Sequence, residues 1–490
     1  MHPLLDIFEK NIDASPERTV LGDPSLMLDY RGLRAVASGL AASIRSETDR
    51  PRVGIMAPTS TACGAAIYAC WYAGRTPVPL NFLLGPEELI KIIRDAGLDC
   101  VIAIDLFAEK LAPTGLKVIP LNAQTLVPGA GSAPEAKPND IAAIIYTSGT
   151  SGDPKGVCLS FDNLVQNTKA AIQHAHMTPD QVFLSVIPQF HSFGLTVGTV
   201  IPPLLGATVW YVPRFSPAAI IGLIAEKKVS IFVAIASMFG ALAKMKTADP
   251  TQLASLVLPI SGGEPLPNAI VQTFKARFGH EIMEGYGMTE TSPVVAVNMP
   301  WLYRPGSVGQ ALPGIEVAIA DTAGKALAAG EIGELVIRGH CVMQGYLNKP
   351  EATAATIREG WLHTGDMGFI DTDGFIHLTG RAKEMMIVGG ENVFPGEIEA
   401  VLCDHPAVAE AAVIGQEDPI RGEIPVAYVI LNENAEIRDS DLRAYCREKI
   451  AGYKAPREVR IVKDLPRGPT GKILKRALRA MPTPSSARPD

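Results

Sequence analysis

A short segment rich in glycine and hydroxyl groups carries the clearest chemical signal in this sequence. It runs Tyr146-Thr-Ser-Gly-Thr-Ser-Gly-Asp-Pro-Lys-Gly-Val157 and follows an apolar run at 141–145 that predicts a buried strand. Glycines let the backbone approach a ligand, and N–H, hydroxyl and lysine donors suit a polyphosphate. The segment is not a Walker A loop, because no Ser or Thr follows Lys155. Taken alone, it is compatible with a hydrolase, a kinase, a nucleotide-binding protein or a flexible surface hairpin.

Four downstream segments add groups that could serve a nucleotide. Glu284-Gly-Tyr-Gly-Met-Thr-Glu290 offers a ring for a purine, a hydroxyl for phosphate and a carboxylate for Mg²⁺. Gly360-Trp-Leu-His-Thr-Gly-Asp366 ends in a carboxylate that can accept from ribose hydroxyls. The other two are Gly380-Arg-Ala-Lys-Glu-Met-Met-Ile-Val-Gly-Gly-Glu-Asn-Val-Phe-Pro-Gly-Glu-Ile-Glu399 and the lysine-bearing turn Pro466-Arg-Gly-Pro-Thr-Gly-Lys472. Each one singly is also typical of an ordinary turn, loop or solvated charge.

The elements around these segments predict an α/β protein with parallel sheets. In the first 140 residues, helix-like spacing at 33–44, 62–73 and 86–96 alternates with strand-like runs at 53–57 and 99–104, and alternation resumes over 160–300. Short β runs separated by Gly and Asp at 306–380 predict a smaller subdomain, a twisted barrel. Mixed α/β returns over 384–480, with helices at 397–403 and 440–450 and strands at 409–414 and 424–431.

Composition excludes several classes of protein. With 47% hydrophobic residues there is material for a large core, and a net charge of −7 gives no electrostatic support for a nucleic-acid partner. The seven cysteines are scattered without a C-x-x-C pair, which indicates reduced thiols rather than disulfides or a zinc site. The uncharged stretch between Asp180 and Arg214 contains prolines and glycines, so we expect buried core and no transmembrane segment. No signal peptide is apparent, and we expect a soluble, cytoplasmic protein.

The five segments together, in this order, resemble the adenylate-forming superfamily, which includes acyl-CoA synthetases, peptide-synthetase adenylation domains and firefly-type luciferases. The resemblance extends from about residue 10 to 480. It implies a large N-terminal AMP-binding domain at 1–381, made of two α/β subdomains and a small β-barrel at about 306–380. A small mobile C-terminal α/β lid would follow at 382–480, with Lys383 at the hinge and a disordered tail at 481–490. Glu384 stands where Asp is usual in the family.

The resemblance also implies roles for the matching residues. The β- and γ-phosphates would contact Thr147, Ser148, Gly149, Thr150, Ser151, Gly152 and Lys155, and the adenine would lie against Gly262, Gly263, Glu264, Tyr286 and Gly287. Thr289 would bind the α-phosphate, Glu290 and Thr150 would hold Mg²⁺, and Asp366 and Arg381 would bind ribose. Lys472 would contact both the carboxylate and the α-phosphate, and Gly389-Gly390 would cover the channel for the incoming thiol.

These roles imply an ATP-dependent ligase. ATP would convert a carboxylic acid to an acyl-adenylate with loss of pyrophosphate, and coenzyme A would then displace AMP. Because Lys472, Glu290, Asp366 and Arg381 are all present, a degenerate nucleotide-binding scaffold is disfavoured. An oxygenase of the luciferase type is disfavoured only by its rarity. The protein would be a monomer or a homodimer.

The acid and the acceptor are less well specified. The segments 188–194 and 235–242, which line the acid pocket in this family, carry no acidic or basic side chain, so an amino acid is disfavoured and a medium- or long-chain fatty acid is favoured. An aryl or short-chain acid and transfer to acyl carrier protein stay open. His191 would orient the carboxylate, and the alternative for it is a structural core histidine.

Overall fold

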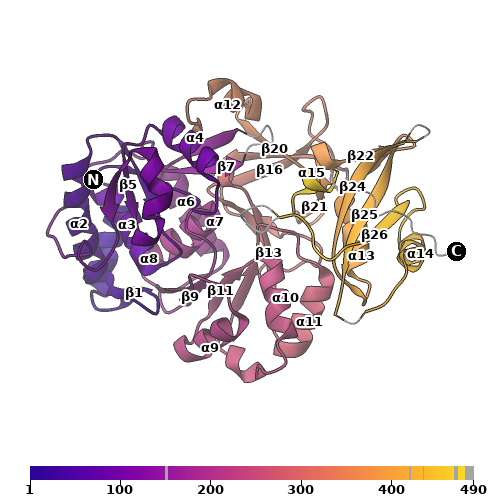
Figure 1. The fold of residues 1–490 in the computed structure, drawn as a ribbon, viewed down its shortest axis with the longest axis horizontal. Coiled ribbons are helices and arrows are strands. Elements are labelled where there is room, and N and C mark those ends of the chain that lie inside the picture. Colours follow the sequence, from indigo (N-terminus) through magenta and orange to yellow (C-terminus); the bar gives the residue numbers. More distant parts are fainter. Residues whose placement is uncertain (149–152, 419–420, 434, 468–472, 480–490) are drawn as a thin grey trace. The chain divides into compact units, whose positions relative to one another are not determined.

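The computed structural model describes residues 1–148, 153–418, 421–433, 435–467 and 473–479. The chain forms two compact units (Figure 1). The larger unit comprises Met1–Pro265, Thr273–Val317 and Ile337–Leu362, and the smaller comprises Leu266–Gln272, Ala318–Val336 and His363–Asp490. Both are mixed α/β, so the fold class expected from the sequence, with a large N-terminal and a small C-terminal part, is confirmed.

A four-stranded parallel sheet organises the start of the larger unit. Its order is β4-β3-β5-β6, from β3 (Arg52–Met56), β4 (Thr76–Pro79), β5 (Cys100–Ala103) and β6 (Lys117–Pro120). Helices α2 (Tyr30–Glu47), α3 (Thr61–Tyr72) and α4 (Pro86–Ala96) accompany it. Helix α4 begins at a proline and ends where Gly97 adopts a φ of 62°, as the sequence predicts. Its apolar face joins the sheet in one core of buried side chains.

A nine-stranded sheet forms the centre of the same unit, in the order β15-β14-β13-β12-β11-β9-β10-β1-β2. The pairs from β1 to β13 are parallel, and β2, β14 and β15 are added antiparallel at the two edges. The strands are β1 (Thr19–Gly22), β2 (Met27–Asp29), β9 (Val182–Ser185), β10 (Thr208–Tyr211), β11 (Ile231–Ala234), β12 (Leu258–Ser261), β13 (Met283–Gly287), β14 (Val294–Val297) and β15 (Gln310–Ala311). The predicted parallel α/β alternation over 160–300 is therefore confirmed.

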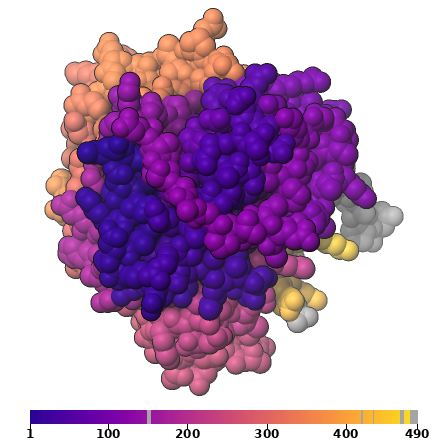
Figure 2. Space-filling view, turned by 90° about the vertical axis from the view of Figure 1, so that its left-hand side faces the viewer, coloured from indigo at the N-terminus to yellow at the C-terminus, as the bar shows by residue number. Residues whose placement is uncertain are grey.

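Several further helices accompany these sheets along the chain. They include α1 (Leu5–Ala14), α6 (Phe161–His174), α9 (Pro217–Lys227), α10 (Ala236–Lys244), α11 (Asn268–Phe278) and α12 (Pro350–Thr356). Short helical segments α5 (Ala108–Leu111), α7 (Ser192–Leu195) and α8 (Ile201–Leu205) interrupt the loops. In the space-filling view of Figure 2, the N-terminal part of the chain, in indigo and purple, gathers on one face of this unit.

A three-stranded sheet carries the glycine-rich segment. Strands β7 (Ile141–Ser148) and β8 (Pro154–Ser160) are antiparallel, and β18 (Gly345–Tyr346) pairs with β8 on its other side. Thr147 lies opposite Lys155 in this ladder. The buried strand predicted before the segment is present, and the segment joins two strands of one hairpin.

The short strands predicted within 306–380 are also present. Five of them form one sheet in the order β16-β17-β20-β19, with β21 paired to β20. Their bounds are β16 (Ile315–Ala320), β17 (Gly333–Gly339), β19 (Ile357–Arg358), β20 (Trp361–Ile370) and β21 (Ile376–Arg381). That these strands close into a barrel stays a prediction.

The C-terminal part of the smaller unit is built on a second mixed sheet. Its order is β23-β22-β25-β24, with β26 parallel to β25, from β22 (Met386–Val388), β23 (Glu391–Val393), β24 (Val408–Asp418), β25 (Gly422–Leu431) and β26 (Glu458–Ile461). Helices α13 (Pro395–Cys403) and α14 (Asp439–Lys449) pack into its core, and α15 (Lys475–Leu478) follows near the end of the described chain. In neither unit do the described residues include a helix both long and apolar enough to traverse a bilayer.

Candidate active site

The carboxyl edge of the central parallel strands gathers most of the predicted site residues of the larger unit. The chain leaves β9 for β10 on one side and then returns to β11 on the other, which makes a topological switch point between β9 and β11. Ligands of open α/β sheets bind outside the carboxyl ends of the strands at such points. The loop with His191 follows β9, α10 follows β11, Glu264 follows β12, and Thr289 follows β13.

Ser192, the residue after His191, connects the His191 loop to Thr289 by a hydrogen bond. His191 is half-buried at the start of α7, and its Nδ1 accepts from the backbone N–H of Phe193 at 3.3 Å. An Nδ1 that accepts leaves the proton of a neutral ring on Nε2. The neighbouring Ser192 lies with its Oγ 3.1 Å from Oγ1 of Thr289, and both hydroxyl groups are buried. The loop that carries His191 is therefore hydrogen-bonded to Thr289, the residue predicted to bind the α-phosphate.

The residues predicted to contact the adenine also lie at the carboxyl edge of the nine-stranded sheet. Glu264 accepts from the backbone N–H of Ser237 at 2.9 Å, which ties the loop after β12 to the start of α10. A Cβ on Gly262 would lie 3.3 Å from the ring of Phe193 and 3.5 Å from the carbonyl of Gly285. This close approach explains the glycine and places it beside the strand that carries Tyr286 and Gly287.

A second contact chain links the glycine-rich segment to Glu290. The ammonium of Lys155 lies 4.7 Å from the ring centroid of Tyr346, and the hydroxyl of Tyr346 donates to Oε1 of Glu290 at 2.9 Å. Glu290 is 8% exposed. Burial, followed by the charge of Glu290, raises the pKa of Tyr346, so the phenol stays a donor throughout the physiological range. Sequence reasoning missed Tyr346, because it lies 56 residues from Glu290 and outside every quoted motif.

The carboxylate oxygens of the buried Glu290 fit Mg²⁺, which is commonly held by one or two carboxylates together with the phosphates of its nucleotide. Thr150, the other predicted ligand, lies outside the described residues. The described residues contain no group of three or more His, Cys, Asp or Glu side chains that could hold a metal alone.

The smaller unit places the two ribose candidates together. Asp366 on β20 lies opposite Arg381 on β21, and Nε of Arg381 is 3.0 Å from Oδ1 of Asp366. The aspartate side chain is 11% exposed and the arginine 48%. Gly389 and Gly390 form the turn between β22 and β23 with φ values of 63° and 92°, a conformation that side-chain-bearing residues adopt at a cost.

A partly buried lysine, Lys475, contacts the segment after the predicted hinge. Nζ of Lys475 lies 3.0 Å from Glu384 and 2.8 Å from Glu399. Burial alone would lower the pKa of Lys475, but the attraction of Glu399 and Glu384 outweighs burial and raises it. Glu384, which departs from the family pattern, therefore has a defined partner within this unit.

Five predicted site residues lie outside the described residues: Gly149, Thr150, Ser151, Gly152 and Lys472. The disordered tail predicted at 481–490 also lies there. The cysteines are all described, and they are free thiols whose pKa values burial raises, to about 11 for Cys158. Such thiols are poor nucleophiles at neutral pH.

Phe239, which the sequence places in the acid pocket, lies within the protein core. It is fully buried and packs edge-to-face against Phe232 and Phe274 at centroid distances of 5.3 Å. Phe190 packs edge-to-face against Phe82, also at 5.3 Å. These contacts favour Met238 and Phe193, which are partly exposed, as the lining of an acid pocket.

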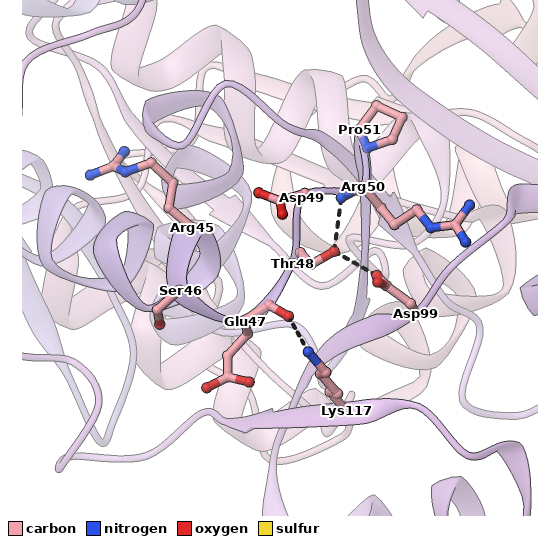
Figure 3. Close-up of a pocket in the computed structure, with 9 residues that line it drawn as sticks. All are labelled: Arg45, Ser46, Glu47, Thr48, Asp49, Arg50, Pro51, Asp99 and Lys117. Atoms are coloured by element: carbon pink, nitrogen blue, oxygen red, sulfur yellow. Dashed lines mark hydrogen bonds between the residues drawn. The ribbon is translucent and has the colours of Figure 1, made fainter.

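A polar cavity of about 360 Å³ lies elsewhere in the larger unit (Figure 3). Its walls are the end of α2 and the residues at the amino ends of β3, β5 and β6, opposite to the edge at which parallel sheets bind ligands. Thr48 donates to Asp99 at 2.6 Å, and Lys117 donates to the carbonyl of Glu47 at 2.7 Å. In Figure 3 the guanidinium groups of Arg45 and Arg50 point in opposite directions, so these donors do not converge on a ligand.

Comparison with known proteins decides the family. The family of AMP-binding enzymes matches residues 8–347, and the C-terminal domain of AMP-binding enzymes matches residues 397–472. The chain belongs to the AMP-binding enzyme family. The resemblance to the adenylate-forming superfamily is thereby confirmed.

The relatives of this AMP-binding enzyme include several CoA ligases and synthases. It is 34% identical over 472 residues to a feruloyl-CoA synthase of an Amycolatopsis species, covering 95% of this chain and 96% of that protein. It is 31% identical over 512 residues to a long-chain-fatty-acid–CoA ligase of Bacillus subtilis, covering 94% and 91%. The structure of o-succinylbenzoate coenzyme A synthetase from Bacillus subtilis, with ATP and magnesium ion, superimposes with a TM-score of 0.86 at 29% identity, covering 96% and 99%.

Proposed function

We propose that this AMP-binding enzyme is an acid–thiol ligase. It would activate a carboxylic acid with ATP to an acyl-adenylate and pyrophosphate, and then transfer the acyl group to coenzyme A with release of AMP. The observation that carries the proposal is the set of contacts at the carboxyl edge of β9–β13, where Ser192 joins the His191 segment to Thr289. The CoA-ligase names of the relatives support it.

The residues of this chain have separable tasks in that reaction. Thr147 and Lys155 would hold the terminal phosphates, Thr289 the α-phosphate, and Asp366 with Arg381 the ribose. Glu290 would hold Mg²⁺, which when bound neutralises charge on the phosphates. Lys472 would face the negative charge that develops at the reacting carboxylate and α-phosphate. One such charge pair at about 4 Å contributes roughly 4 kcal/mol at an effective dielectric of about 20.

For the acid, we favour a medium- or long-chain fatty acid. The segments 188–194 and 235–242 present Phe193 and Met238 and contain no Asp, Glu, Lys or Arg that could pair with a charged substrate group. An aryl acid is the second candidate, because the feruloyl-CoA synthase is similar over nearly the whole chain. Acyl carrier protein is the alternative acceptor.

Pyrophosphate release tests both assignments. The purified enzyme with ATP and Mg²⁺ is offered saturated acids from acetate to stearate, an aryl series from benzoate to hydroxycinnamates, and a set of amino acids. Each acid is tested with CoA, with acyl carrier protein and with neither. We expect the largest rate with acids of intermediate to long chain and with CoA. A maximum in the aryl series would replace the fatty acid by an aryl acid, and release with amino acids alone would contradict the proposed pocket.

A further inference from the structure

Tyr346 contacts two residues to which the proposed reaction gives different tasks. Its ring faces the ammonium of Lys155 at 4.7 Å, and its hydroxyl donates to Glu290 at 2.9 Å. The first partner would bind phosphate and the second would bind Mg²⁺. Tyr346 itself is 9% exposed, and it offers a π-face to the cation and a hydroxyl donor to the anion.

The strand register accounts for the contact with Lys155. Tyr346 on β18 is paired with Val157 on β8. Side chains two apart on a strand share a face, so Lys155 and Val157 point the same way and Lys155 is the diagonal neighbour of Tyr346. Hydrogen bonds from Leu347 to the carbonyl of Gly156 (2.7 Å) and from Gln344 to that of Cys158 (2.9 Å) fix this register.

The contact between Tyr346 and Glu290 is supported by backbone hydrogen bonds at Met343 and at Tyr346. The backbone N–H of Met343 donates to the carbonyl of Glu290 at 2.9 Å, and the backbone N–H of Tyr346 donates to Oγ1 of Thr353 at 2.9 Å. The backbone of the segment that carries the Tyr346 phenol is therefore hydrogen-bonded to the backbone of Glu290, whose carboxylate the phenol contacts. Such support fixes the orientation of a carboxylate before a metal arrives.

We propose that Tyr346 is a positioning residue for ATP·Mg²⁺ binding, whose ring places the Lys155 ammonium and whose hydroxyl places the Glu290 carboxylate. This inference rests on the proposed function, since it assigns to these partners the phosphate and the metal. It extends that function by making one side chain responsible for the relative placement of both. The ring and the hydroxyl act on different partners, so they can be removed separately.

The test measures ATP binding by calorimetry without acid, over a range of Mg²⁺ concentrations. In Tyr346→Phe the ring remains and the hydroxyl is lost, so we expect the Mg²⁺ concentration for half-maximal ATP binding to rise about 10- to 100-fold, with ATP affinity at saturating Mg²⁺ within about threefold of the original. In Tyr346→Leu we expect the same metal shift and a further loss of about two- to fivefold in ATP affinity without Mg²⁺, because the cation–π contact is gone.

Tyr72→Phe is the matched control. Its hydroxyl is buried and donates to Glu9 at 2.6 Å, so it loses the same kind of bond far from the predicted site residues, and we expect its Mg²⁺ dependence to be unchanged. Thr353→Val, which touches neither partner but removes the acceptor for the Tyr346 backbone, is expected to shift the Mg²⁺ dependence in the same direction by a smaller factor.

The outcomes separate this inference from the proposed function. If the original protein binds ATP·Mg²⁺ and Tyr346→Phe gives the same Mg²⁺ titration, the positioning role is wrong and the proposed function stands. If the original protein binds no ATP with Mg²⁺, the proposed function itself fails. An equal metal shift in Tyr72→Phe would mean that the effect is a general loss of stability, which also overturns the positioning role.

Discussion

Replacing Asp366 by Asn removes a charge at the predicted ribose site while keeping the shape of the side chain. In the structure this carboxylate is largely buried on β20 and contacts Arg381 on β21 at 3.0 Å. If Asp366 accepts hydrogen bonds from the ribose hydroxyls, the substitution weakens ATP binding. If the carboxylate serves only the sheet, the substitution affects stability instead.

The expected loss of ATP affinity is larger than the expected loss of folding stability. A hydrogen bond to a charged acceptor contributes about 1.5–3 kcal/mol, so losing its charge raises the Kd for ATP about 10- to 150-fold. The contact with Arg381 contributes far less to folding, about 1 kcal/mol or below, because the arginine is half exposed and solvent screens the pair. We therefore expect a large loss of ATP affinity with a small change in thermal stability.

Calorimetry with ATP and thermal denaturation measure these two quantities on the same protein. Glu316→Gln is the matched control, because it breaks a carboxylate–arginine contact with Arg338 between the neighbouring strands β16 and β17, where no site residue is predicted. An ATP affinity within about threefold of the original in Asp366→Asn would refute the ribose assignment. A denaturation midpoint that falls together with the affinity would assign the residue to the sheet.

Three further substitutions test other parts of the structure by thermal denaturation. Lys475→Met leaves two carboxylates without their cation, so we expect a loss of about 1–3 kcal/mol. The folded-state pKa of this lysine is raised above its ordinary 10.5, so its contribution to the free energy of unfolding is present below pH 10.5 and is lost as the pH rises through the folded pKa. The stability difference between the original protein and Lys475→Met should therefore shrink in that pH range. A stability difference that stays constant there would contradict the ion pairs. Gly287→Ala would place a Cβ 1.9 Å from the carbonyl of Pro293, so we expect a loss of about 1–3 kcal/mol and weaker ATP binding. Gly222→Ala, in open space within α9, should instead stabilise by about 0.5–1 kcal/mol, and similar behaviour of both glycine variants would refute the steric argument.

Local signals in the sequence predicted much of the fold. Helix α4 has the predicted bounds because Pro86 and Gly97 mark its ends, and α2 is longer than predicted because Asp29 caps it three residues earlier, accepting from Gly32 at 2.6 Å. The buried runs that became β3 and β5 were recognisable because both faces of a parallel sheet are covered.

Pairings between distant segments could not be predicted in the same way. Tyr346 became a neighbour of Lys155 through the register of β18 against β8, which depends on tertiary packing. The family resemblance implies that the segment 235–242, which contains Phe239, lines the acid pocket, but it does not show which side chains face the pocket and which face the core with Phe232 and Phe274. The contact of Ser192 with Thr289 likewise follows from the order of the parallel strands.

The outer strands of the nine-stranded sheet have a consequence for aggregation. Strand β10, with the sequence Thr-Val-Trp-Tyr, is covered on one side by β9 and on the other only by β1, which comes from the first residues of the chain. Without Thr19–Gly22 and the short strand β2, this β-prone strand would present an open row of backbone donors and acceptors to other molecules. The beginning of the chain therefore protects the sheet against edge-to-edge association, although it lies far in sequence from the strand that it covers.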